Sequence, residues 1–341
     1  MLVSKFANEI EEQPQNLQRL IDKIPLIKGN LSKIRSKNPR IVFFGMGSSF
    51  YAAISPAYLF ISHGIEANFF DASEILCYAS DEWFRKFDIV VFITQSGETS
   101  EIKSLIDRIA GFKNLMKVVI TAHPESYVAK KADIVIDTYS DEEKSIGATK
   151  TYVNSVIAAF IFVLSFTEEY EKEIDFIRQM PYEIMNSIKK ANKNVEMILN
   201  IKTADDFDSS VISSTGFVLS SVYQSVLTIN AIASTNMFPI SIGMLEHHGP
   251  ERLFFKKRGF IAFIPSSLNK QSFVRLYNAI ISTCGFCWII SCGPKGLPLF
   301  DKLCFEDEII SDIPEYLQSL LFLPYMQILS YKITTMPEEM S

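Results

Sequence analysis

Basic residues are few in this sequence. It has 33 Lys and Arg against 39 Asp and Glu, which gives a formal net charge of −6 and a pI near 5.4. No stretch gathers lysines and arginines into the basic stripe that nucleic-acid-binding proteins carry, so nucleic acid is not expected as a partner. An anionic ligand would be held by backbone N–H groups and local dipoles, because the protein has no bulk positive field.

Cysteines and long apolar runs are also rare. The five cysteines are odd in number, and their spacing matches no disulfide framework and no zinc motif. We therefore expect reduced thiols and no metal. The opening sequence, MLVSKFANEIEEQPQNL, lacks the apolar stretch of a signal peptide. The longest apolar run, Val156–Leu164, is far shorter than a membrane span. These absences favour a cytoplasmic protein with no membrane segment.

Short apolar segments alternate with helical patterns in the first half of the chain. The expected strands are Arg40–Phe44, Ala67–Asp71, Asp88–Thr94, Lys117–Thr121 and Asp133–Asp137. Strands of this kind, separated by helices, indicate a parallel sheet covered on both faces. With right-handed crossovers, the sheet and its helices form a doubly wound, Rossmann-like lobe.

The same alternation restarts, less clearly, in the second half. Strands are expected at Thr215–Leu219, Ile240–Gly243, Gly259–Ile264 and Cys287–Ser291, and a long apolar helix at Tyr316–Thr335. No fixed-period repeat supports a duplication, so a second lobe is inferred from the order of elements alone. The predicted fold class is α/β, with two tandem Rossmann-like αβα sandwich lobes and parallel sheets. The expected parts are an N-terminal helical arm (1–38), a first lobe (39–170), a helical connector (171–204) and a second lobe (205–341).

Three loops of small residues follow strands of the first lobe. They are Gly47–Ser49, Thr94–Thr99 and Ser145–Thr149, and a helix is expected after each. Ligands of open parallel sheets bind beyond the carboxyl ends of the strands. A helix N-terminus offers unpaired N–H groups and about +0.5 of an elementary charge, and glycine lets the backbone approach an oxygen closely. Such residues are also good caps and turn formers. Three of these loops at strand ends nevertheless favour a phosphate site.

Two other functions fit these loops less well. Gly45-x-Gly47 begins a dinucleotide fingerprint, but Phe50 occupies the position of the third glycine. Gln95-Ser96-Gly97 lacks the pattern of a hydrolase nucleophile elbow. The sequence therefore predicts no cofactor.

Several motifs together resemble a known family. GMGSSFYAA (45–53), TQSGETSE (94–101) and EKSIGATKTY (143–152) are similar to the three signature loops of the SIS (sugar isomerase) domain. EEQP (11–14), ASE (72–74) and, more weakly, EHHGP (246–250) resemble features of the subfamily with two such domains. That subfamily includes the isomerase half of glucosamine-6-phosphate synthase and the fructosamine-6-phosphate deglycases. The resemblance spans roughly residues 5 to 335.

The resemblance implies a phosphosugar-binding protein of carbohydrate metabolism and a set of site residues. His248, the histidine of the HGP motif, would help to open the sugar ring. In several relatives this histidine comes from the neighbouring subunit, which implies a homodimer with sites near the subunit interface. The positions that would bind phosphate and sugar hydroxyls are Gly47, Ser48, Ser49, Thr94, Gln95, Ser96, Thr99, Ile146 and Thr149.

The sequence departs from this family at the expected proton shuttle. Isomerising and deglycating relatives carry a glutamate in the second-lobe helix before HGP, whereas no Asp or Glu occurs here from Ser209 to Leu245. The polar side chains near that place are neutral and cannot act as a general base near neutral pH as a carboxylate does. The functional lysine of a closing C-terminal tail is also expected to be missing, since Lys332 is the last lysine. The neutral candidates are Asn230, Ser234, Thr235 and Asn236.

Glu246 is a candidate substitute for the missing glutamate. It stands two residues before His248, and on an extended loop such residues project to the same side. An exposed loop glutamate without a catalytic role is the alternative. His247 and His248 with Glu246 and Glu251 lack the spacing of a helical zinc motif, so no metal is expected.

Two hypotheses follow for the function. In the first, the protein is an enzyme that isomerises, deaminates or deglycates an amino-sugar or ketosamine 6-phosphate, with His248 and Glu246 as its catalytic residues. In the second, it is a binding or regulatory protein that retains the phosphate loops and has lost the proton shuttle.

Overall fold

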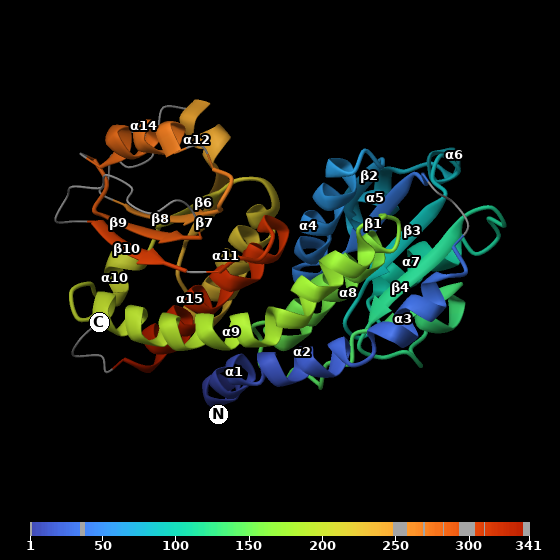
Figure 1. The fold of residues 1–341 in the computed structure, drawn as a ribbon, viewed down its shortest axis with the longest axis horizontal. Helices are drawn as coiled ribbons and strands as arrows, with labels where there is room; N and C mark the ends of the chain where they lie inside the picture. Colours follow the sequence, from blue (N-terminus) through green and yellow to red (C-terminus); the bar gives the residue numbers. More distant parts are fainter. Residues whose placement is uncertain are drawn as a thin grey trace. The chain divides into compact units, whose positions relative to one another are not determined.

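The computed structural model describes residues 2–34, 38–247, 258–268, 270–281, 283–292, 304–309 and 311–336. The chain forms two compact units, each a sheet flanked by helices (Figure 1). The N-terminal lobe contains residues 12–143 and 148–181, and the C-terminal lobe contains residues 1–11, 144–147 and 182–341. The division falls inside helix α9 (Tyr170–Leu199), within the segment predicted as a helical connector. The domain bounds given above remain predictions.

The N-terminal lobe is built on a five-stranded parallel sheet in the order β2-β1-β3-β4-β5. Each strand begins and ends within one residue of its expected bounds. The strands are β1 (Ile41–Gly45), β2 (Ala67–Asp71), β3 (Ile89–Ile93), β4 (Met116–Thr121) and β5 (Ile134–Asp137). The helices are α2 (Gln13–Ile21), α3 (Ile24–Leu31), α4 (Ser48–Ser62), α5 (Ala72–Tyr78), α6 (Asp81–Phe84), α7 (Ser100–Arg108) and α8 (Lys150–Leu164).

Both faces of this sheet are covered, which explains why its central strands are apolar at every position. Val42 and Phe44 of β1 point into a core that helices α5, α6 and α7 complete. Phe43, between them, points to the other face, where its ring centroid lies 6.1 Å from that of Phe60 on α4 and 6.3 Å from that of Phe162 on α8. Side chains alternate between faces along a strand, so each face receives its own hydrophobic layer.

Helices α4 and α8 pack side by side and run in the same direction (Figure 1). Phe60, near the end of α4, contacts Phe162 and Phe166, near the end of α8, at centroid distances of 5.8 and 5.4 Å. Their C-terminal ends therefore lie together, and so do their N-terminal ends. Since α4 follows β1 directly, both helices begin at the carboxyl end of the strands.

The C-terminal lobe has a parallel sheet in the order β10-β9-β8-β6-β7. Numbered from its own first strand, this is the 2-1-3-4-5 order of the N-terminal sheet, so the predicted fold of two Rossmann-like lobes is confirmed. The strands are β6 (Val211–Ser214), β7 (Phe238–Ser241), β8 (Gly259–Ile264), β9 (Phe286–Ser291) and β10 (Cys304–Glu308). The helices are α1 (Leu2–Glu11), α10 (Ala204–Phe207), α11 (Leu219–Ala233), α12 (Ile242–His247), α14 (Lys270–Ile280) and α15 (Glu315–Thr335).

Three expectations for this lobe differ from the structure. The strand expected at Ile240–Gly243 lies two residues earlier, as β7 (Phe238–Ser241), and Ile242 begins α12. The strand expected at Thr215–Leu219 is wrong: β6 ends at Ser214, and Gly216, with φ +55°, begins a turn into α11. Strand β10 was not expected, because its sequence, CFEDE, is mostly charged. It lies at the sheet edge, where charged side chains are common and discourage pairing with other chains.

Among the described residues, one segment has the length and hydropathy to cross a membrane, Gly216–Ala233. Half of it is buried inside the structure, and core helices of soluble proteins pass the same test. This is weak evidence for a membrane span.

Candidate functional site

The strand order of the N-terminal lobe determines where a ligand is expected. The order in which strands are added to the sheet reverses between β1 and β3, because β2 lies on one side of β1 and β3 on the other. Open α/β sheets bind ligands beyond the carboxyl ends of the strands at such a switch point. The first two predicted loops follow β1 and β3 and therefore flank it.

The loop after β1 brings the start of α4 close to the strand. A Cβ on Gly45 would lie 2.4 Å from the carbonyl carbon of Ser49 and 2.5 Å from the nitrogen of Phe50, so only glycine fits there. Gly47 has φ +53° and immediately precedes α4. As the N-cap residue, Gly47 has no side chain to cap the helix. Ser48 and Ser49 are half-buried in its first turn.

The loop after β3 is held by hydrogen bonds within itself and to β4. The buried Thr94 hydroxyl accepts a bond from the Gly97 amide (3.2 Å) and lies 3.4 Å from the Thr99 hydroxyl. The Gln95 carbonyl accepts hydrogen bonds from the Thr121 hydroxyl (3.1 Å) and from the backbone amide of Ala122 (3.2 Å). Thr99 precedes α7, and its side chain makes no cap hydrogen bond. The structure thus brings Thr94, Gln95 and Thr99 together at one strand tip.

Glu98, the acidic residue of this loop, is paired with two neighbouring residues. Glu98 forms an ion pair with Lys103 and accepts a hydrogen bond from the Tyr127 amide (3.0 Å). The hydrogen bond from Lys103, followed by that from Tyr127, lowers the pKa of Glu98. The Ser96 hydroxyl accepts a bond from the Glu98 amide (3.2 Å). The glutamate is therefore anchored, while the half-buried Ser96 keeps a hydroxyl proton to donate.

The third loop is organised by a carboxylate. Glu143 accepts hydrogen bonds from the amides of Thr149 (2.9 Å) and Thr151 (3.2 Å), and from both of their hydroxyls. The N-terminal end of α8 is thus occupied by a side chain of the protein. Thr149 is fully buried, whereas Ile146 is 69% exposed.

The first lysine of α8 is paired rather than available to a ligand. Lys150 is buried at 3% exposure, and its ammonium group lies 2.5 Å from a carboxylate oxygen of Glu12. Within the same helix, Asn154 donates to the carbonyls of Asn16 (3.1 Å) and Thr138 (2.8 Å). These bonds tie α2 to α8 and give the start of α8 a fixed place.

Another acid lies at this edge of the sheet. Asp137, the last residue of β5, accepts a hydrogen bond from the amide of Tyr139 (2.7 Å), which has φ +50°. Burial raises the pKa of Asp137, and the Tyr139 hydrogen bond and the charge of His123 oppose that shift. Acidic residues with a shifted pKa are enriched at functional sites, but the sequence gave no signal for Asp137.

Segment 144–147 packs within the C-terminal lobe. Glu9 of α1, only 3% exposed, accepts hydrogen bonds from the amides of Lys144 (2.6 Å) and Ser145 (3.0 Å). A Cβ on Gly147 would lie 2.8 Å from the Phe6 ring and 3.2 Å from Ile232. Sequence reasoning missed Glu9 and Glu143. The available signal for Glu143 was that it begins the EKSIGATKTY motif.

The neutral side chains considered for the proton-shuttle position have structural partners. The Asn230 amide donates to the Met237 carbonyl (2.8 Å), and its oxygen accepts from the Thr235 hydroxyl and the Met237 amide (both 2.9 Å). Asn236 donates to Asp208 through both its backbone amide (2.8 Å) and its side chain (3.0 Å).

Of the predicted catalytic pair, His248 lies outside the described residues. Glu246 is exposed and lies in helix α12, so the extended loop expected at this residue is wrong. Among the described residues, no group of three or more His, Cys, Asp or Glu side chains could hold a metal ion. The site residues predicted from the sequence, including this pair, remain predictions.

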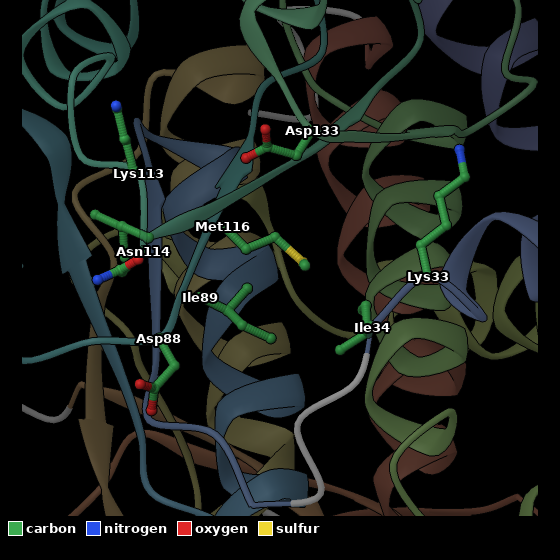
Figure 2. Close-up of a pocket in the computed structure, with 9 residues that line it drawn as sticks. Lys33, Ile34, Asp88, Ile89, Lys113, Asn114, Met116 and Asp133 are labelled. Atoms are coloured by element: carbon green, nitrogen blue, oxygen red, sulfur yellow. The ribbon is translucent and has the colours of Figure 1, made fainter.

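A hollow of about 460 Å³ lies at the opposite end of the N-terminal sheet (Figure 2). Its lining includes Asp88, just before β3, with Ile89 and Met116 at the starts of β3 and β4. Lys33 and Asp133 also line it. These residues lie at the amino ends of the strands, so the hollow is separate from the three candidate loops.

The N-terminal lobe matches the model of a known protein family. Residues 33–165 match the SIS domain family model. The chain is 27% identical over 340 residues to the isomerizing glutamine–fructose-6-phosphate aminotransferase of Methanocaldococcus jannaschii, which covers 96% of this chain and 29% of that protein. The corresponding protein of Pyrococcus horikoshii is 23% identical and covers 97% of this chain and 54% of that protein. The chain thus spans about half, or less, of the length of these curated relatives.

Solved structures show the same fold. The C-terminal domain of glucosamine-fructose-6-phosphate aminotransferase from Francisella tularensis has a TM-score of 0.83 at 19% identity, covering 97% of this chain and 95% of that one. Tagatose-6-phosphate ketose/aldose isomerase from Escherichia coli has a TM-score of 0.80 at 14% identity, with coverages of 97% and 92%. The match to the family model places an SIS domain at residues 33–165 of this chain.

Proposed function

We propose that this chain binds a sugar 6-phosphate at the strand tips of its N-terminal lobe. The observation that carries the proposal is the pair of helices α4 and α7, whose N-cap residues make no side-chain cap hydrogen bond and which begin on the two sides of the switch point between β1 and β3. Their N–H groups and the nearby hydroxyls of Ser48, Ser49, Ser96 and Thr99 are suited to a dianion in an acidic protein. The relatives named above all carry a sugar 6-phosphate in their names.

We further propose that the protein is an enzyme acting on an amino-sugar or ketosamine 6-phosphate, as an isomerase, deaminase or deglycase. Such chemistry needs ring opening and then a base beside C1 and C2. His248 is proposed to open the ring, and Glu246 to move the proton. No cofactor or metal is required. The proposed assembly is a cytoplasmic homodimer with its sites near the subunit interface.

A second candidate is a sugar-phosphate-binding or regulatory protein without turnover. It is favoured by α11, whose sequence, LSSVYQSVLTINAIA, contains no carboxylate. The side-chain amide of Asn230 on this helix makes three hydrogen bonds to residues 235–237. A neutral amide that already has partners does not replace a proton-shuttling carboxylate.

The binding proposal predicts a large effect of a double substitution in the loop after β3. Ser96→Ala combined with Thr99→Val removes two hydroxyls but keeps the side chains small. The double substitution should raise the Kd for fructose 6-phosphate at least about tenfold, because hydrogen bonds to charged groups contribute about 1.5–3 kcal/mol each. Isothermal titration calorimetry measures the change. Ser104→Ala is the matched control, because its exposed hydroxyl bonds only the Ser100 carbonyl one turn along α7 (2.9 Å). Unchanged affinity in the double variant would argue against this site.

Turnover distinguishes the two candidate functions. The protein is incubated with fructose 6-phosphate, tagatose 6-phosphate, glucosamine 6-phosphate and a fructosamine 6-phosphate, and product and ammonia are measured. Turnover that is lost in His248→Ala and Glu246→Gln identifies the enzyme. A ligand-induced rise in Tm without turnover identifies the binding protein. Light scattering coupled to size exclusion tests the homodimer directly.

A further inference from the structure

The loop after β3 is bonded to the segment that follows β4. The Tyr127 amide donates to the Glu98 carboxylate (3.0 Å), and the Val128 amide donates to the Gly97 carbonyl (3.4 Å). The Glu98 amide in turn donates to the Ser96 hydroxyl (3.2 Å). All of these residues belong to the N-terminal lobe. The position of the half-buried Ser96 hydroxyl therefore depends on Glu98, and that of Glu98 depends on Tyr127.

The side chain of Tyr127 is held by three charged residues, although it is 39% exposed. The ammonium groups of Lys103 and Lys131 lie 5.3 and 4.3 Å from the centre of its ring, within the range of cation–π contacts. Its hydroxyl donates to Asp107 (2.8 Å) and accepts from Lys131 (2.7 Å). Lys103 also forms the ion pair with Glu98. These contacts restrict the backbone at Tyr127 and, through its amide, the Glu98 carboxylate.

The negative charge of Glu98 separates two possible roles by the sign of their effect. Hydrogen bonds from Lys103 and from the Tyr127 amide lower the pKa of Glu98, so the carboxylate is ionised at neutral pH. If this charge only repelled a phosphate, its removal would strengthen phosphate binding. If the carboxylate holds the loop in its binding conformation, its removal weakens phosphate binding, because the Ser96 hydroxyl loses its fixed position.

We propose that Glu98 and Tyr127 are positioning residues for phosphate binding. Together they hold the loop after β3 so that the Ser96 hydroxyl can donate to a phosphate oxygen. Neither side chain touches the ligand, and both act through Ser96. The inference rests on the proposed function, because it requires that the strand tips of the N-terminal lobe bind a phosphate.

Calorimetric titrations with inorganic phosphate and with fructose 6-phosphate test the role of Glu98. Glu98→Ala removes the acceptor of the Tyr127 amide and should raise both Kd values roughly tenfold, as expected for weakening one hydrogen bond to a charged ligand. Glu98→Gln keeps an oxygen that can accept from the same amide, so it should restore both Kd values to within about twofold of the wild type. Because Glu98 is exposed, neither substitution leaves a cavity in the core.

The matched control is Glu101→Ala. It removes another carboxylate from the first turn of α7, and the hydrogen bond lost with it comes from the neighbouring Ser100 hydroxyl (2.7 Å). The Kd values should stay the same or fall, because a negative charge near the phosphate is removed without loosening the loop.

The role of Tyr127 is tested through its coupling to Glu98. Tyr127→Ala should raise the Kd for inorganic phosphate by a factor similar to that of Glu98→Ala, and the two together should add little, because both changes release the same contact. Tyr127→Phe keeps the ring and loses the hydroxyl bonds, so it should give a smaller rise and allows the test even if Tyr127→Ala folds poorly. Thermal melts of each variant report stability separately, and Tm should stay close to that of the wild type.

Three results overturn the inference and leave the proposed function intact, provided that Ser96→Ala with Thr99→Val still weakens binding. The first is phosphate affinity that is unchanged or higher in Glu98→Ala. The second is an equal loss in Glu101→Ala, since any change in carboxylate charge at the start of α7 would then suffice. The third is fully additive losses in Glu98→Ala and Tyr127→Ala. A wild-type protein that binds neither inorganic phosphate nor fructose 6-phosphate overturns the inference and the proposed function together.

Discussion

Gly45→Ala lowers the free energy of unfolding by about 3 kcal/mol or more, the upper range for overpacking a well-packed core. The added Cβ would lie 2.4–2.5 Å from three backbone atoms of Ser49 and Phe50 in the first turn of α4. Backbone atoms cannot turn aside as a flexible side chain can, so α4 must move away from β1. Because this turn forms one side of the proposed phosphate site, binding of fructose 6-phosphate should be lost as well. Urea denaturation followed by circular dichroism measures the loss of stability.

Gly29→Ala is the control for this substitution, with an effect of opposite sign. Gly29 lies inside α3, and a Cβ there meets no atom within 4 Å. Alanine should therefore raise stability by about 0.5–1 kcal/mol through helix propensity. Gly47→Ala tests strain separately, since its Cβ also meets nothing but its φ is +53°. Equal stability of Gly45→Ala and the wild type would show that the close approach of α4 to β1 is not as described.

Gly97→Ala will reduce the affinity for fructose 6-phosphate by at least about a hundredfold, which corresponds to about 2.7 kcal/mol. Gly97 has φ +63°, and its Cβ would lie 1.9 Å from the Ser126 hydroxyl oxygen and 2.4 Å from the Ser126 Cβ. Backbone strain of about 1–3 kcal/mol and the steric clash both push the loop away from Thr94 and Thr99. Calorimetry measures the affinity, and a thermal melt reports the accompanying loss of stability.

A compensating substitution tests the reason given for this effect. Ser126→Gly removes both clashing atoms and leaves only the strain from φ. The double variant Gly97→Ala, Ser126→Gly should therefore recover part of the lost affinity. Ser126→Gly alone should bind nearly normally, since Ser126 is not among the proposed ligand-binding residues. Full wild-type affinity in Gly97→Ala would contradict the described course of this loop.

The N-terminal lobe could be predicted from sequence because its signals are local. Runs such as DIVVFIT and KVVIT are too short for helices and too apolar for loops, and they became β3 and β4. The loops could also be predicted from a local signal, the small residues directly after these strands. Glycines such as Gly45 and Gly97 occur where a Cβ would collide with a neighbour, so the sequence signal has a steric cause.

What could not be predicted depends on contacts between distant residues. Glu9 accepts hydrogen bonds from residues more than 130 positions away, and no periodicity in α1 indicates this partner. Strand β10 was not predicted because its own sequence is mostly charged, and the residues that stabilise it lie on β9. The beginning of the C-terminal sheet was misplaced because β6, VISS, is only four residues long. Short strands with small polar residues resemble loops until a partner strand is known.

The make-up of the C-terminal lobe has a consequence for dissecting the protein. Residues 1–11 and 144–147 belong to this lobe together with everything after residue 181. Phe6, fully buried, lies where a Cβ on Gly147 would contact its ring. A single cut of the backbone in the middle of α9 would separate the C-terminal fragment from residues 1–11 and 144–147, which belong to its lobe. The two lobes are therefore interleaved along the chain, and neither half of a bisected polypeptide would contain one complete lobe and nothing else.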